Sequence, residues 1–538
     1  MASSHPNDGN LQIGNARNAT TSNAHPQYSY WANAWRTIRD CVLGEIEIKA
    51  QGQTYLPQMA GQSNEEYNEF LERSYFYNMT ARTVHGLVGT IFRRDPKIKN
   101  FPEKFKSNLK NITKDNQSLL AFSKEATREV IEVGRFGILL DMPEFADVSG
   151  RNTPFMAGYV AENIVDWDVE DVDGRYELTK VVLREVSMDR HTDGAVLAMS
   201  GHRSRFKIGY RVLKLVLDEE TNRLIYQQWI YTPEAGNTGL PADNQTPDEI
   251  ITPTSLGRPF DRIPFVFFGP FSNSSEVQKP PLLDIACMNV SHYKSAAQLE
   301  HGRHYTALPV YHIQVTAESE AGEYVVGPNT VWEYTGDKPP GIAEYNGHGL
   351  GFLEKALDQK EHHISSLGGR MLGVRTQATA ESDNLVKLRQ QNEQSLLLNV
   401  SSGISEGFTQ LLELWLKWMG EEPDIDMSVE LNQDFLIEPL KAREFRAVTM
   451  MYEQGILPID VIFDVMQKAE VISEYMTLEE FKGQLDNTDN FPNNPDVHAR
   501  RLGYPDAKTQ LELNAQEAEQ QNEAPTVPET AGPTPKVN

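Results

Sequence analysis

The chain has 538 residues, and its 76 acidic against 50 basic side chains give a formal net charge of −26. The length exceeds what one core supports and predicts two or more domains. The acidic balance argues against a protein that grips nucleic acid tightly through a basic surface. Two cysteines, Cys41 and Cys287, are too few for a disulfide framework. We expect no secretory signal and no membrane span, because a basic leader with an apolar core and an apolar run of about 18–20 residues are both missing from the sequence.

The first half of the chain predicts helices followed by short strands. Residues 1–25 are rich in Asn, Ser and Thr and predict a mobile arm. Ser63 with Glu66 forms a capping-box pattern, and apolar residues at helical spacing follow it from Tyr67 to Ile91. A second helix is expected over about 117–133, ending at Gly134, and then a strand from about residue 136. From about residue 155 to 270, β-rich runs alternate with turn residues.

Two long helices are predicted in the second half, with a small β module between them. Pro281 opens the first, which runs to about residue 305 and carries small residues, among them Ala286, Ala296 and Ala297. Residues 307–350 are β-like, with Gly and Pro throughout. The second helix covers about 352–372. At 1.5 Å per residue each helix is roughly 30–40 Å long, so the pattern predicts a stalk with a tip.

The remaining segments are a loop, another long helix and further helical pieces. The loop covers 373–382 and is poor in bulky side chains. The next helix runs to Gly420, a strand follows Pro423, and the segment 440–484 is helical with a second capping box at Thr477 and Glu480. The end of the chain, from about residue 513, is rich in Gln, Glu, Pro and Thr and predicts a disordered tail.

This order of parts resembles the portal proteins of tailed bacteriophages. More specifically, it is similar to a portal-like family long known only as a conserved phage domain of unknown function. The resemblance lies in a series of short motifs whose order is more specific than any one of them. They are GQTYLPQ (52–58), ARTVHGLVG (81–89), IFRRDP (91–96), GRFGILLD (134–141), IPF (263–265), PPLLDIA (280–286) with Asn289, His292 and Tyr293, and LNQDF (431–435).

The resemblance implies an α+β portal-type fold with a division of labour along the chain. After the arm at 1–25, it implies a mixed α/β wing (26–280), a stem helix (281–306), a β-rich clip (307–350), a second stem helix (351–372), a channel loop (373–382), a crossing helix with a wing strand (383–436), a helical crown (437–490) and a mostly disordered C-terminal extension (491–538).

The resemblance also implies a function and partners. Portal subunits form a ring, typically of twelve copies, at one capsid vertex of the virion, assembled in the host cytoplasm. Double-stranded DNA passes through the ring without sequence specificity. The implied protein partners are the terminase large subunit, head-completion (adaptor) or tail proteins, and the major capsid and scaffold proteins. No membrane, cofactor or metal is implied, and the chain is not expected to be an enzyme. With no G-x-x-x-x-G-K-[ST] sequence, the packaging motor would be another protein.

Two sets of site residues follow from this interpretation. Arg375 is the only cation of the loop, and we expect it to make weak phosphate contacts that let DNA move. Small residues such as Ala297 are expected to let stem helices of neighbouring subunits approach closely. The channel-loop residues are Val374, Arg375, Thr376, Gln377, Thr379 and Glu381, and the clip docking surface is Tyr334, Gly336, Asp337, Lys338 and Pro339.

Other interpretations compete with the portal hypothesis. Residues 403–407 match the G-x-S-x-G nucleophile elbow, so an esterase using Ser405 is one alternative. Against it, the apolar stripe crosses the motif in helical register, and only His498 follows the serine. Histidines 301 and 304, and the Glu361-His362-His363 run, are more typical of polar helix faces than of a metal site. A capsid-associated structural protein without a pore is the other alternative.

Overall fold

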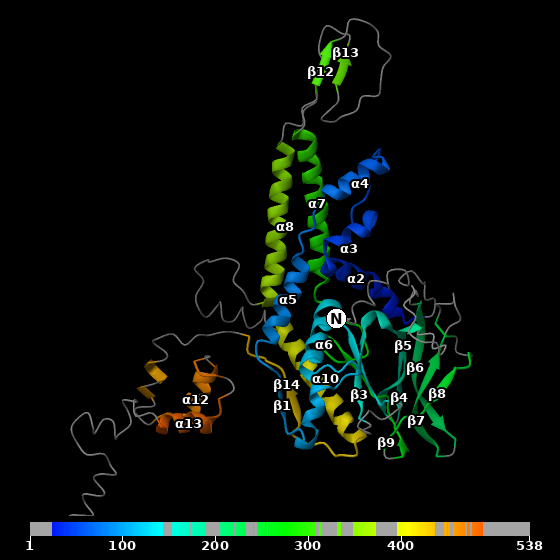
Figure 1. The fold of residues 1–538 in the computed structure, drawn as a ribbon, viewed down its shortest axis with the longest axis vertical. Coiled ribbons are helices and arrows are strands. Elements are labelled where there is room, and N and C mark those ends of the chain that lie inside the picture. The colour runs from blue at the N-terminus through cyan, green and yellow to red at the C-terminus, as the bar shows by residue number, and fades with distance from the viewer. Residues whose placement is uncertain are drawn as a thin grey trace, which may run out of the picture. The chain divides into compact units, whose positions relative to one another are not determined.

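The structure, a computed structural model, divides into two units, Met1–Phe435 (unit 1) and Leu436–Asn538 (unit 2). It contains both helices and sheets, so the fold class is α+β, as predicted (Figure 1). The structure describes residues 24–143, 153–172, 174–189, 205–219, 221–232, 240–241, 245–255, 257–307, 311–314, 331–334, 348–372, 395–435, 446–448, 450–451, 456–468, 471–473 and 476–487.

Helices dominate the N-terminal part of unit 1. The capping box predicted at Ser63 and Glu66 is confirmed. The prediction of helical spacing that continues from Tyr67 to Ile91 is wrong. The first helix ends at residue 73, and a second begins after Asn78, which caps it by accepting a hydrogen bond from Ala81 N–H at 2.9 Å. The elements are α2 (Pro26–Leu43), α3 (Glu45–Ala50), η1 (Gly52–Thr54), α4 (Asn64–Arg73), α5 (Met79–Ile91), η2 (Glu103–Lys110) and α6 (Leu119–Val133), which ends at Gly134 as predicted.

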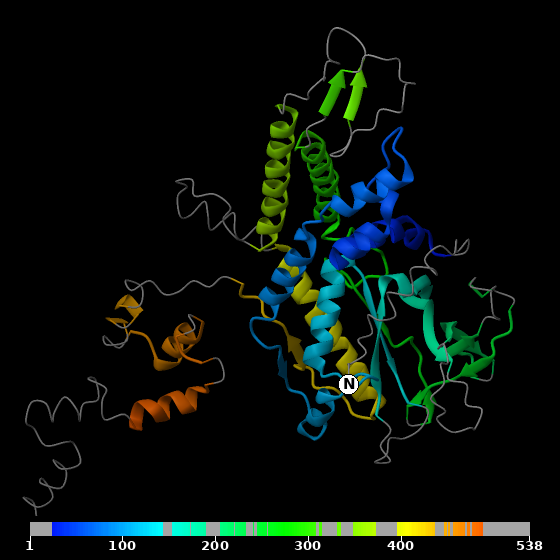
Figure 2. The same ribbon diagram turned by 45° about the horizontal axis from the view of Figure 1, so that its top comes forward.

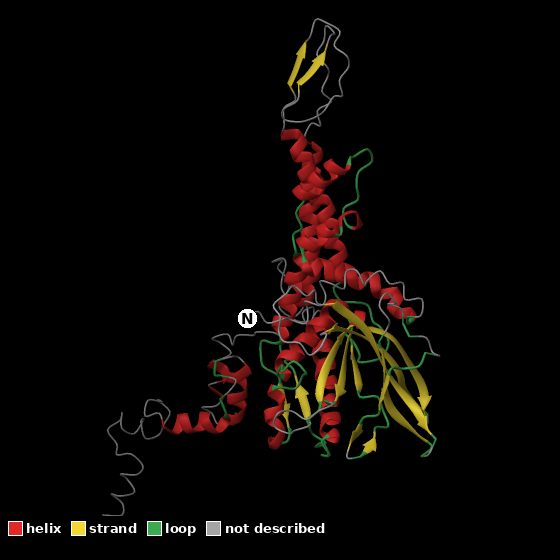
Figure 3. Cartoon of the chain, turned by 45° about the vertical axis from the view of Figure 1, so that its right-hand side comes forward, coloured by secondary structure: helices red, strands yellow, loops and turns green. Residues whose placement is uncertain are grey.

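Antiparallel sheets form the middle of unit 1 and confirm the β content predicted for residues 155–270. The three-stranded sheet has the order β11-β2-β3, and the five-stranded sheet has the order β4-β5-β6-β7-β8. Figure 3 shows these strands in yellow beside the helices. The strands are β2 (Phe136–Asp141), β3 (Phe155–Val160), β4 (Ile164–Val172), β5 (Arg175–Asp189), β6 (Arg205–Asp218), β7 (Arg223–Tyr231), β8 (Glu249–Ile251), the short β9 (Thr254–Ser255) and β10 (Arg258–Pro259), the 3₁₀ turn η3 (Ala161–Asn163), and β11 (Phe265–Phe268).

The three-stranded sheet lies between two hydrophobic clusters. Alternate residues of a strand point to opposite faces. Accordingly, Val266 and Phe268 of β11 join the helices in one cluster, whereas Phe265 and Phe267 join the five-stranded sheet in the other. On the helical side, α10 (Ser395–Trp418) places Phe408 5.5 Å from the ring of Phe268. The sheet therefore connects the helical and β parts of unit 1.

A buried ion cluster connects α2 to α6 and to η3, just before β4. Arg39 pairs with Glu129, with Glu132 at 2.7 Å and with Glu162 at 2.9 Å. Arg128 also reaches Glu132, at 2.7 Å. Two cations thus face three carboxylates. Burial raises the pKa of Glu129 to about 7, although Arg39 opposes the shift. The cluster holds one more acidic group than its cations neutralise.

The elements that follow the sheets include the long helices of unit 1. They are α7 (Leu283–Ala307), β12 (Tyr311–Gln314), β13 (Val331–Tyr334), α8 (His348–Leu372), α10 and β14 (Ser428–Glu430), which pairs with β1 (Lys97–Lys99). In unit 2, α12 (Ile459–Lys468) and α13 (Leu478–Asn487) meet through Phe463 and Phe481, and the predicted capping box at Thr477 and Glu480 is confirmed. Among the described residues, every helix falls short of the length and apolar character needed to span a bilayer.

Candidate functional site

The predicted pair of long helices is present, as α7 and α8, which pack against each other (Figure 1). On α8, Leu357 and Ile364 are buried. On α7, buried and half-buried side chains predominate, because α2, α4 and α5 also pack on it. Close approach near one end depends on Gly302, where a Cβ atom would lie 2.6 Å from Leu350 Cδ2. The pair is thus a fixed part of unit 1.

Polar side chains cross between the two helices. Lys360 donates to the Ser291 carbonyl oxygen at 2.9 Å and to Ser295 Oγ at 2.6 Å. Arg303 pairs with Glu354 at 2.8 Å. Lys360 gave no recognisable signal in the sequence, because its role depends on which residues the opposite helix presents.

The polar residues of α7 that belong to the family resemblance form hydrogen bonds to neighbouring elements of the same chain. Asn289 Oδ1 accepts hydrogen bonds from the backbone N–H of Met79 and Thr80 and from Thr80 Oγ1, and Asn289 Nδ2 donates to Tyr77 O. Asn289 therefore supplies a hydrogen-bond acceptor to backbone N–H groups in the first turn of α5, which have no partner within the helix. Tyr293 Oη lies 3.0 Å from Ser74 Oγ, and His292 Nε2 lies 3.2 Å from Glu361 Oε1. Burial lowers the pKa of His292 despite this carboxylate.

The small residues of α7 do not form the surface that the sequence suggested. Ala286 and Ala296 are fully buried, and Ala297 is 1% exposed, all against elements of the same chain. The expectation that they let neighbouring subunits approach is wrong for this reason. Their small size instead lets α2, α4, α5 and α8 pack around α7.

The β module between the two helices is described only in part. β12 and β13 pair in parallel, from Tyr311 opposite Val331 to Gln314 opposite Tyr334. Of the predicted docking surface, Tyr334 belongs to β13, and the other four residues, 336–339, lie outside the described residues. The channel loop 373–382, with all six of its predicted site residues, also lies outside them, as do residues 383–394 and the tail from residue 488.

Ser405 lies in the middle of α10, not on a strand-to-helix turn. Its Oγ donates to the Ser401 carbonyl oxygen at 2.7 Å and accepts from Leu431 N–H at 3.0 Å. Thr409 Oγ1 accepts from Val429 N–H, and Ser401 Oγ donates to Asn432 O. Three hydroxyls at i, i+4 spacing thus form hydrogen bonds with backbone groups in β14 and in the two residues after it.

The glycines of the same motif have packing roles. Gly407 faces Phe268 of β11, and Gly403 O accepts a hydrogen bond from Asn273 Nδ2 at 2.7 Å. Ser405 and Gly407 of the motif therefore both contribute to the packing of α10. The signal that separates this helix from an elbow is the hydroxyl stripe at positions 401, 405 and 409.

The histidines do not assemble a metal site within the described part of the chain, where three or more His, Cys, Asp or Glu side chains nowhere converge. The ring of His301 packs on Phe70 at 4.9 Å, and His362 and His363 are exposed on α8.

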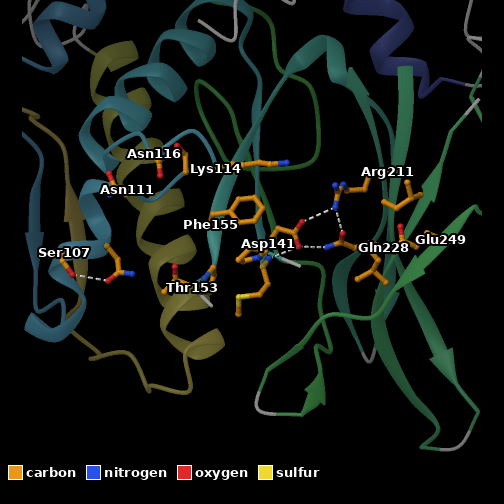
Figure 4. A pocket seen from close by; sticks show the side chains of 17 residues that line it. Ser107, Asn111, Lys114, Asn116, Asp141, Thr153, Phe155, Arg211, Gln228 and Glu249 are labelled. Carbon is orange, nitrogen blue, oxygen red and sulfur yellow. Dashed lines mark hydrogen bonds and ion pairs between the residues drawn. The ribbon is translucent and has the colours of Figure 1, made fainter. Parts of the chain in front are cut away.

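A cleft of about 990 Å³ lies between the η2 region and the five-stranded sheet (Figure 4). Part of its wall is a network of charged and polar side chains. Arg211 pairs with Asp141 at 3.1 Å and with Glu185 at 2.8 Å, and Gln228 bridges Arg211 and Asp141. Sequence reasoning did not single out this cleft, because its walls come from segments more than a hundred residues apart. Arg211, Asp141, Glu185 and Gln228 satisfy one another, and this network joins β2 to β5, β6 and β7.

The comparisons with known proteins concern the helix pair. Residues 281–419 match a family model described as a domain of unknown function (DUF4055). The match begins just before α7 and ends just after α10, so it contains both long helices, the β module and the hydroxyl stripe. A search of curated proteins finds no match.

Proposed function

We propose that this chain is the portal-type subunit of a tailed bacteriophage, which forms a ring at one capsid vertex and lets double-stranded DNA pass. The observation that carries the proposal is the α7–α8 pair with the parallel β12–β13 pair between its helices in the sequence. Two helices of 25 residues each are roughly 37 Å long. A helix pair of this length, on which α2, α4 and α5 pack, suits a rigid stem.

The way the stem is anchored supports a mechanical role. Asn289 satisfies the N-terminal turn of α5, and Tyr293 reaches the end of α4. Removing a buried side chain that forms hydrogen bonds with the backbone of another element lowers stability, because the backbone groups are left buried without partners. These contacts would therefore transmit a force on the stem to the wing, and the two parts would move together.

The net charge supports passage of DNA rather than its retention. Each phosphate that a protein neutralises strengthens binding and its salt dependence. A chain with a net charge of −26 offers few such contacts. We propose that Arg375 and Gln377 of the loop 373–382 make weak contacts with DNA phosphates.

We also propose that residues 336–341 of the clip bind the terminase large subunit and the head-completion proteins.

Electron microscopy and mass measurement of the purified full chain test the proposal. The expected result is a closed ring with an axial hole, with a mass near twelve copies. A monomer at all concentrations, or a closed shell-like assembly without a hole, would overturn it. Replacing 336–341 by a Gly-Ser linker should leave the ring intact and abolish DNA packaging, whereas Arg375→Ala with Gln377→Ala should leave rings and motor binding normal and impair packaging or retention.

A further inference from the structure

The start of α2 is fixed to the five-stranded sheet. In Figures 1 and 2, α2 runs from this sheet, where it begins, to α7. The backbone N–H of His25, the residue before the helix, donates to the Val165 carbonyl oxygen of β4 at 3.1 Å. The imidazole ring of His25 stacks on Trp167 of the same strand, with 3.9 Å between the ring centroids. His25 is therefore the point at which the chain that leads into α2 meets β4.

His25 is also the N-cap of α2, and this capping depends on its protonation state. Its Nδ1 accepts a hydrogen bond from the backbone N–H of Gln27 at 3.2 Å. A ring nitrogen accepts a hydrogen bond only while it carries no proton, so the neutral ring must hold its proton on Nε2. The usual caps, Ser, Thr, Asp and Asn, have oxygens that accept throughout the neutral range. The cap of α2 is instead a group that titrates in that range.

Two carboxylates of β4, those of Asp166 and Asp168, act on His25. Lys180 of β5 pairs with both of them, at 3.0 Å and 2.6 Å. A protonated His25 would therefore share these carboxylates with an ammonium group that already binds them.

The ring on which His25 stacks already carries a cation. The guanidinium carbon of Arg135 lies 4.1 Å from the Trp167 ring centroid, and Arg135 is 2% exposed. Proton uptake by His25 would place a second positive charge on the same ring. Burial lowers the pKa of His25, Asp166 opposes this shift, and Arg135 adds to it.

We infer that His25 is a pH-sensitive latch, which fixes the first turn of α2 and the chain before it to β4 while the ring is neutral and releases both when the ring takes up a proton. The added proton occupies Nδ1 and points at the Gln27 N–H, so the acceptor of the cap is lost. The Gln27 side chain still accepts from Val277 N–H, and Tyr28 Oη still donates to the Glu162 carbonyl oxygen. The release is therefore confined to the first turn and leaves the body of α2 in place.

The pH dependence of the latch has a definite sign. The folded pKa of His25 lies below the ordinary value of 6.5, so its contribution is complete above about pH 6.5 and is lost as pH falls. The buried cluster at Arg39 of the same helix acts with the opposite sign, because the pKa of Glu129 is raised and its contribution is lost as pH rises. The direction of the change therefore separates the two effects.

Hydrogen exchange of the full chain tests the latch. It is measured by mass spectrometry at pH 8 and pH 5 and corrected for the intrinsic pH dependence of exchange. Protection of the backbone amides of residues 25–31 should fall about fivefold at pH 5, which is the effect of losing a typical N-cap. The first turn of α6 is the internal control, because its cap is the hydroxyl of Ser118, which does not titrate in this range.

Three variants identify the titrating group. His25→Asn keeps an acceptor that does not titrate, and its protection should be the same at both pH values. His25→Phe keeps a ring for Trp167 but has no acceptor, and its protection should be low at both. His85→Asn, at an exposed histidine of α5, is the matched control and should retain the wild-type pH dependence.

Two results would overturn the latch. One is equal protection of residues 25–31 in the wild type at the two pH values. The other is a pH dependence that persists in His25→Asn, since another group would then titrate. Neither result bears on ring formation, because the latch acts within one copy of the chain.

Discussion

Phe268 of β11 occupies the space that a side chain at position 407 of α10 would need. A Cβ atom on Gly407 would lie 2.2 Å from Phe268 Cε1, a distance that no packed side chain tolerates. Phe268 cannot retreat easily, because it is 1% exposed and packs on Phe408 as well. This contact sets how closely α10 approaches the three-stranded sheet.

Gly407→Ala should therefore destabilise the protein, although alanine is the better helix former. Overpacking of a filled core costs about 1–3 kcal/mol. Gly89→Ala is the control, since it adds the same methyl group to a helix with open space around it and should stabilise by about 0.5–1 kcal/mol. Urea unfolding of both variants measures the difference. Equal stability of the two variants would show that β11 moves aside readily.

Ser405→Ala should lower stability and leave any ester hydrolysis unchanged. The substitution removes the acceptor of the buried Leu431 N–H, and an unsatisfied buried donor costs about 1–3 kcal/mol. Chemical unfolding and hydrolysis of an activated ester check the two parts of the prediction. Loss of hydrolysis with unchanged stability would instead mark Ser405 as a nucleophile.

Glu129 should make stability depend on pH near neutrality. Its folded pKa of about 7 lies above the ordinary value of 4.5, so the folded state holds the proton more tightly than the unfolded state does. This contribution is complete below about pH 4.5 and is lost as pH rises through about 7. The unfolding free energy of the wild type should fall across this window.

Glu129→Gln should flatten that dependence, because the amide does not titrate. Glu170→Gln, at an exposed position of β4, should leave the profile as it is. Denaturant midpoints between pH 5 and pH 8 provide the comparison. A glutamine variant with the wild-type slope would assign the titration to another group of the cluster.

Much of the local structure could be predicted because its causes are local. The capping boxes at Ser63 and Thr477 and the end of α6 at Gly134 follow from hydrogen bonds within a few residues. The break between α4 and α5 could not be found this way. Apolar spacing continues through it, and the turn depends on Asn289, more than two hundred residues away.

The sequence by itself determined the mixed class, the two long helices and the β segment between them, because hydrophobic periodicity and turn residues act over short distances. Only the tertiary structure decided what particular side chains do. Ala297 and Ser405 looked available to a neighbouring subunit or a substrate, yet both are buried against their own chain. Burial is a property of several elements packed together, so spacing along one helix cannot reveal it. The same packing leaves Ile46 and Gly89 exposed, and spacing along one helix does not reveal that either.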